Sequence, residues 1–418
     1  MAQWQQGGTP GPPTHAVEIE SRSIWAAVLA GAAALAVGLI AFRGYRPPLA
    51  GDGSVAIHAS VVCGATAGLA FVAGYVQNVR TVHVWLGSRP VLRQVVDVAA
   101  LLVVHSSIAV MSSLVLFRLF QQAFFGLTVD AVAGATMLAV ASGVAGYFAY
   151  TSGARITAAT LSVLLAVFMA SGMLVSMLFA ENPLWWHSMF SELGTGQAGL
   201  TSFWTFNTTI TTSGVILTTL SAFITRDLRR WAVALDARDE RDGRRRRRFL
   251  RPRPAVVRAC LIASGVCMAG IGVFPVNTFE PVHTGFVRLL ALILANLLLG
   301  VPLWLPGFPG AFYLLSLIAV ASLAGAAVLW RPLQYYNLTA LEPGAAGIVF
   351  GWLVVFIRTT AAVVEAAGVG HALPGEPAEG DTAAGGDTAR AAGAVPGRAP
   401  EARPMDDGAA ADRHAARH

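Results

Sequence analysis

About ten apolar runs, each about 20 residues long, are the feature that most constrains how this chain folds. A run of that length crosses a bilayer as an α-helix, because an open strand would leave backbone donors and acceptors without partners in hydrocarbon. Composition agrees, since 55% of the 418 residues are hydrophobic and 12% are charged. The sequence therefore predicts an all-α, polytopic transmembrane helical bundle, with spans near 23–42, 55–78, 95–117, 129–151, 156–180, 201–224, 255–274, 286–305, 310–330 and 344–366.

The spans and the segments around them predict the domain organisation. The first apolar run is not preceded by a basic segment or followed by a cleavage site, so we expect a retained span and not a signal peptide. The tail has few large apolar residues, which is typical of disorder. The predicted parts are a flexible N-terminus at 1–22, a four-span bundle at 23–151, a six-span module at 156–366 and a disordered cytoplasmic tail at 371–418.

Arginine placement predicts the orientation. The loop at 226–258 within the six-span module carries 13 arginines against five acidic residues, which favours the cytoplasmic side. With ten spans, both termini are then cytoplasmic too. Because topology explains the charge of this loop, we expect no nucleic-acid partner. The run Arg244 to Arg248 either binds anionic lipid headgroups or acts only as a topology signal in a solvated loop.

Polar residues inside the spans are few. His105 is the main ionisable side chain there, and we expect it to form a hydrogen bond between helices. The scarcity of charges disfavours an ion-coupled mechanism. The span at 201–224 is rich in threonine. One helical stripe in it either lines a polar cavity or packs through its glycine, with threonines that bond back to carbonyls of their own helix: Asn207, Thr211, Gly214 and Thr218.

Small residues in the spans predict helix packing. Cys63, Cys260 and Cys267 lie within apolar runs, and we expect them to be buried. Two glycine pairs have the spacing that lets helices approach closely, Gly64 with Gly68 and Gly347 with Gly351.

Two polar stretches interrupt the apolar pattern, WWHSMFSELGTG at 185–196 and FPVNTFEPVHTG at 274–285. Chain parity places both outside the cytoplasm, near the start of the threonine-rich span. Their polar side chains, with one residue from each following span, are the ligand-binding candidates: His187, Ser191, Glu192, Asn207, Asn277, Glu280, His283 and Arg288.

Three interpretations of these stretches stay open. They are structural, with Ser191 or Glu192 capping a helix, Gly194 and Gly196 shaping turns and Glu280 pairing with Arg288. Alternatively, four side chains bind a divalent metal or a polar lipid headgroup: His187, Glu192, Glu280 and His283. In the third, Ser188 or Ser191 forms a nucleophile and base pair with a histidine. No catalytic motif selects the third, so no catalytic residue is assigned, and no cofactor beyond that metal is predicted.

The segments HSMFSELGTG, an early FN in the next span and GIGVFPVNTFEPVHTGF resemble a bacterial membrane family, domain-of-unknown-function family 998. The matching positions are His187, Ser191, Glu192, Leu193 and Gly194, then Phe274, Pro275, Asn277 and His283. Asn277 departs from the family, in which an acid is common there, and this weakens the metal interpretation. The first motif is also similar to the damage-regulated autophagy modulator family, six-span proteins linked to lipid organisation. The resemblance covers roughly 156–366 and implies a bacterial plasma (inner) membrane protein.

These patterns together favour a non-enzymatic protein that binds or organises lipid or envelope components through an outward polar pocket below the two stretches. Its partner is the lipid bilayer, and the sequence identifies no protein partner. Transport of a small molecule or lipid is the alternative, and a membrane-embedded hydrolase or lipid-modifying enzyme is the second alternative.

Overall fold

The computed structural model describes residues 15–81, 90–241, 243 and 251–367. In this part of the chain, ten helices are long and apolar enough to span a membrane, which confirms the predicted all-α multi-pass architecture. The predicted tail at 371–418 and the run Arg244 to Arg248 lie outside the described residues. The long helices are α1 (His15–Ala41), α2 (Val55–Thr81), α4 (Val91–Ala123), α5 (Ala131–Ala154), α6 (Ala158–Leu178), α7 (Leu200–Arg241), α8 (Pro254–Val273), α9 (Val276–Trp304), α10 (Gly310–Trp330) and α11 (Leu338–Ala366).

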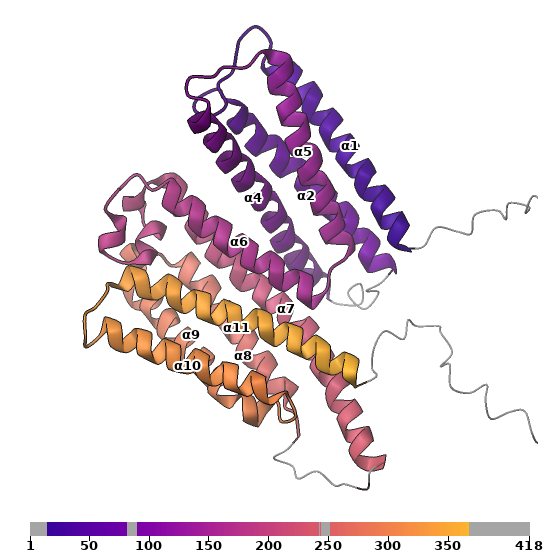
Figure 1. Ribbon diagram of the computed structural model, residues 1–418, viewed down its shortest axis with the longest axis vertical. Helices are drawn as coiled ribbons and strands as arrows, with labels where there is room; N and C mark the ends of the chain where they lie inside the picture. The colour runs from indigo at the N-terminus through magenta and orange to yellow at the C-terminus, as the bar shows by residue number, and fades with distance from the viewer. Residues whose placement is uncertain (1–14, 82–89, 242, 244–250, 368–418) are drawn as a thin grey trace, which may run out of the picture. The chain divides into compact units, whose positions relative to one another are not determined.

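Contacts between the helices fall into two groups (Figure 1). Helix α5 packs along α1 and α2, and α2 also packs on α4, while α6 to α11 contact one another. Helix α4 belongs to both groups because it also contacts α6 and α7. At this junction the hydroxyl of Thr219 on α7 donates to a carboxylate oxygen of Asp97 on α4 at 2.7 Å. Asp97 is therefore a buried link between the groups.

Glycines let the N-terminal helices approach closely. A Cβ on Gly74 of α2 would overlap the carbonyl of Tyr150 on α5, and Gly153 faces the carbonyl of Phe71 in the same way. The predicted pair Gly64 and Gly68 packs against α4, which confirms that expectation. Gly347 and Gly351 on α11 are different, because no atom within the described residues would lie within 4 Å of an added Cβ.

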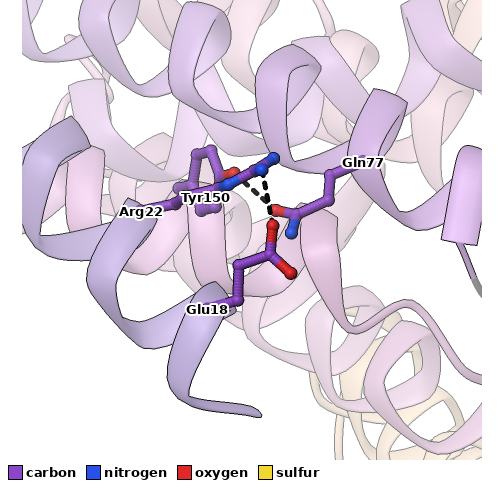
Figure 2. A network of polar contacts seen from close by, with 4 residues as sticks. All are labelled: Glu18, Arg22, Gln77 and Tyr150. Atoms are coloured by element: carbon purple, nitrogen blue, oxygen red, sulfur yellow. Dashed lines mark hydrogen bonds and ion pairs between the residues drawn. The ribbon is translucent and has the colours of Figure 1, made fainter. Parts of the chain in front are cut away.

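Polar contacts lie near the ends of α1, α2 and α5 (Figure 2). The Tyr150 hydroxyl donates to the Gln77 side-chain carbonyl at 2.5 Å, and Glu18 forms an ion pair with Arg22 one turn later on α1. Both members of the ion pair are exposed, so we expect it to contribute little to stability. Helix α1 begins at His15, so the last part of the predicted flexible N-terminus is helical.

Helices α7 and α8 are joined by backbone contact. A Cβ on Gly214 would overlap the Gly265 carbonyl, and one on Gly272 would overlap the Thr211 hydroxyl. A Cβ on Gly265 would likewise lie 2.7 Å from the Thr218 methyl. The predicted stripe on the threonine-rich span therefore packs on α8. Of the two interpretations of that stripe, packing is the one that the geometry supports.

Helix α7 runs to Arg241, well past the predicted end of its apolar run. Its extension has an apolar face, on which Leu228 and Trp231 are buried. Trp231 contacts Phe308 with ring centroids 5.1 Å apart, and the Arg238 guanidinium donates to the Ala366 carbonyl at the end of α11 at 3.0 Å. These contacts stabilise the end of α7 as a helix, although the charge of this segment alone predicts a loop.

Substitution of Gly214 by alanine tests the α7–α8 contact. We expect Gly214→Ala to lower the free energy of unfolding by about 1–3 kcal/mol, because the methyl group has no space. The matched change Gly347→Ala fills open space and should leave stability unchanged or raise it by roughly 0.5 kcal/mol through helix propensity. Unfolding followed by tryptophan fluorescence in detergent measures both. Equal effects of the two changes would contradict close packing at Gly214.

Candidate functional site

The loop between α6 and α7 folds into three short 3-10 turns, η1 (Trp185–His187), η2 (Phe190–Gly194) and η3 (Gly196–Ala198). Within it, the Thr195 hydroxyl donates to the Glu192 carbonyl at 2.8 Å and to its carboxylate at 3.1 Å. The Glu192 carboxylate thus forms a hydrogen bond inside the loop. The glycine with a left-handed backbone conformation in this loop is Gly199, at φ 93°, and not the expected Gly194 or Gly196.

Asn207 binds the loop to α7. Its amide donates to the Gly194 carbonyl and to the Phe203 carbonyl, both at 2.9 Å, and the nearby Ser202 hydroxyl donates to the Leu193 carbonyl at 3.0 Å. A Cβ on Gly194 would lie 2.7 Å from the Phe206 ring, so glycine is required there for close approach. Asn207, predicted as a ligand-binding residue, is buried and holds the loop in place.

The start of α11 supplies the other partners of the loop. The backbone N–H of Ser191 donates to a carboxylate oxygen of Glu342 at 3.0 Å, and the Asn337 amide donates to the Trp186 carbonyl at 2.7 Å. Asn337 also caps α11 by accepting from the Ala340 N–H at 3.2 Å. Sequence reasoning missed both residues, because they precede the predicted apolar run. Their signal was an Asn at an N-cap position with an acid in the first turns.

The second polar stretch is mostly helical. Helix α9 begins at Val276, and Pro281 removes a backbone donor two residues after a kink at Phe279, where φ is −136° and ψ is 51°. His283 is buried, and its Nδ1 lies 2.9 Å from the Phe274 carbonyl. Because a carbonyl only accepts, Nδ1 carries the proton. His283 therefore anchors the start of α9 against the end of α8.

Among the described residues, no ion pair joins the remaining predicted ligands. The exposed residues are His187, Asn277, Glu280 and Arg288, and the His187 ring lies against Trp186, with centroids 3.9 Å apart. Elements η2 and α9 are close, yet among the described residues no hydrogen bond or ion pair joins the two polar stretches. The expected Glu280–Arg288 pair is likewise absent from this part of the chain. Nor do the described residues include a group of three or more His, Cys, Asp or Glu side chains that could hold a metal ion.

A hollow lies elsewhere, in a crevice that α4, α5 and α6 line together with two residues of α2. Its volume is about 1080 Å³, and its walls are mainly alanine, valine, leucine and phenylalanine. Val140, Phe148 and Val163 line it and are largely exposed, so the crevice opens sideways, where a bilayer would lie. No sequence motif indicated it, because ordinary apolar residues of separate spans form its walls.

One polar pair lies in the crevice wall. His105 on α4 has Nδ1 at 2.7 Å from the Leu101 carbonyl and Nε2 at 2.9 Å from the Ser152 hydroxyl on α5. The carbonyl fixes the proton on Nδ1, so Nε2 accepts and Ser152 donates. The His105 ring also stacks on Phe71, with centroids 4.3 Å apart. This arrangement confirms the predicted bond between helices.

Removal of the Glu342 carboxylate tests how the loop is held. We expect Glu342→Ala to leave the Ser191 N–H without its acceptor and to speed amide exchange across 190–195 about tenfold. Glu342→Gln keeps an acceptor oxygen and should have a smaller effect. Hydrogen–deuterium exchange of the full chain measures this, with the exposed Glu280→Ala as the control. Unchanged exchange in Glu342→Ala would show that α11 does not hold the loop.

Comparisons of the chain with protein-family models, with curated proteins and with solved structures found no match. The resemblance to the bacterial family therefore stays a prediction, and the functional proposal depends on the geometry of the chain itself.

Proposed function

We propose that this integral membrane protein is a non-enzymatic lipid-binding or lipid-organising protein that holds a hydrocarbon chain of a bilayer lipid in the crevice between α4, α5 and α6. The crevice is the observation that supports the proposal. Its volume of about 1080 Å³ is at the upper end of ligand pockets, which are on the order of 300–1,000 Å³. Its apolar walls and sideways opening suit a ligand that arrives from the bilayer.

The physical reason for occupation is packing. Lipid tails are as apolar as the crevice walls, so a tail gains little hydrophobic free energy by leaving the bilayer. An empty crevice, however, would leave Ala109, Met137 and Val144 without contacts on one side. A flexible chain restores those contacts. Such a site holds lipid without chemistry, which agrees with the non-enzymatic role expected from the sequence.

The outward pocket expected below the two polar stretches receives less support. Backbone groups of the first stretch form hydrogen bonds with the side chains of Asn207, Glu342 and Asn337. His283 bonds to the Phe274 carbonyl. For the location we propose a bacterial plasma membrane, with the charged end of α7 and both termini in the cytoplasm. The end of the crevice near the α5–α6 connection would then lie in the cytoplasmic leaflet.

A crevice-filling substitution tests lipid binding. In liposomes that contain a phospholipid with a diazirine on its acyl chain, we expect illumination to label peptides of α4, α5 and α6. Ala145→Trp places an indole ring in the crevice and should reduce this labelling several-fold, because the chain loses its space. Val61→Trp, at an exposed position outside the crevice, should not.

Equal labelling in the two variants would contradict the proposal, provided that both unfold at the wild-type temperature. The same liposomes, with fluorescent lipid in one leaflet, test the transport alternative. Movement of that lipid to the other leaflet would favour transport, since a binding protein leaves the leaflets unmixed.

A second candidate function is lipid ester hydrolysis, and the Ser152–His105 pair is the observation that favours it. The Ser152 oxygen would attack the ester carbonyl and form an acyl-enzyme, while Nε2 of His105 takes the hydroxyl proton and passes it to the departing alcohol. Water, deprotonated by the same nitrogen, would then attack the acyl carbonyl and break its bond to the Ser152 oxygen, which takes the proton from His105 as the fatty acid leaves. The Leu101 carbonyl holds the histidine in the required tautomer. The sequence candidates Ser188 and Ser191 form no such pair with a histidine among the described residues.

Fatty-acid release from phosphatidylglycerol liposomes decides between binding and hydrolysis. If the pair is catalytic, Ser152→Ala should reduce release by a factor of about 100 or more, because the nucleophile is lost. Ser112→Ala, at another crevice serine, should retain it. If the wild-type chain releases no fatty acid, the hydrolase function is wrong and the binding function is unaffected.

A further inference from the structure

We infer that the end of the crevice at the α5–α6 connection binds the phosphate of an anionic phospholipid whose chain occupies the crevice. This inference rests on the proposed lipid binding and adds the headgroup class. Because the hydrocarbon part of a lipid distinguishes little between one lipid and another, selectivity must come from the headgroup. Among the described residues that line the crevice, Arg155 is the one cation.

Arg155 is the C-cap of α5, and helix α6 begins three residues later at Ala158. Ala159 and Thr160, in the first turn of α6, line the crevice beside it. A helix N-terminus carries partial positive charge, so guanidinium and helix end act in the same direction on an anion. Arginine also matches phosphate through two parallel hydrogen bonds.

The connection that carries Arg155 is fixed. The Thr157 hydroxyl accepts from the Thr160 N–H at 3.1 Å, and the Thr160 hydroxyl accepts from the Thr157 N–H at 2.8 Å, a reciprocal capping box. The Thr160 hydroxyl also lies 3.1 Å from the Arg155 carbonyl, to which it donates. These bonds hold the Arg155 backbone at the end of the crevice, while its side chain is exposed.

The guanidinium is not engaged by an acid of the described chain. Arg155 has no salt bridge to any residue in the described ranges. The Glu20 carboxylate accepts the Tyr147 hydroxyl at 2.5 Å and forms no ion pair with Arg155. Glu18 pairs with Arg22 on the same helix. A phosphate of a lipid in the crevice would therefore meet a guanidinium that has no ion-pair partner among the described residues.

Competition between two lipids tests the inference. The full chain in detergent is offered phosphatidylglycerol and phosphatidylcholine with identical acyl chains, and native mass spectrometry counts what it retains. We expect the wild type to prefer phosphatidylglycerol about five-fold, as one arginine near a membrane surface provides. Arg155→Gln should abolish the preference without changing the unfolding temperature, and Arg155→Lys should keep part of it. Arg288→Gln, an exposed arginine on α9, should keep all of it.

The outcomes separate the inference from the proposed function. If both lipids are retained equally by the wild type, and Ala145→Trp reduces both, lipid binding stands and the headgroup inference is wrong. If Ala145→Trp changes neither, the crevice is not the lipid site and the proposed function fails. A loss of preference in Arg288→Gln equal to that in Arg155→Gln would place the headgroup elsewhere. Inorganic phosphate at the lipid concentration should not displace the lipid, and displacement would show that the site binds free anion.

Discussion

Close backbone contact at glycines holds these helices together, because hydrocarbon provides no hydrophobic force between them. Gly74 and Gly153 bring α2 against α5, and Gly214 and Gly265 bring α7 against α8. At these points no side chain separates the backbones, so many dispersion contacts form over a short length. Where α5 and α6 lack such contact, lipid-sized space remains between them, and the crevice is the result.

The two polar regions of the chain have different roles. Backbone groups of the loop between α6 and α7 form hydrogen bonds to the side chains of Asn207 and Glu342. These backbone groups therefore have partners at the membrane boundary. The crevice has few polar groups, but they differ in availability. Ser152 and His105 bond to each other, whereas the Arg155 guanidinium has no acid partner among the described residues. The crevice is a better candidate for binding than the loop, because it has a polar group without an acid partner and not because it has more polar residues.

Much of the fold could be predicted from the sequence. Span length and hydropathy placed the ten long helices of the described residues, since backbone hydrogen bonding in hydrocarbon permits little else. Glycine spacing predicted the contact of Gly64 and Gly68, but the same spacing at Gly347 and Gly351 faces open space. The spacing of two glycines shows that they share a helix face, but it does not show which element packs on that face. The extension of α7 was also missed, because its charge obscured the buried Leu228 and Trp231.

The site depended on tertiary structure. The sequence by itself determined that His187, Glu192 and His283 lie beside apolar runs. Only the folded chain decided their partners: Glu342, remote in sequence, binds the loop, and His283 turns to Phe274. The crevice is wholly tertiary, since alanines and valines of α4, α5 and α6 are ordinary span residues until three helices diverge around them. Local pattern fixes which segments are helices, whereas the packing of one helix on another fixes the spaces between them.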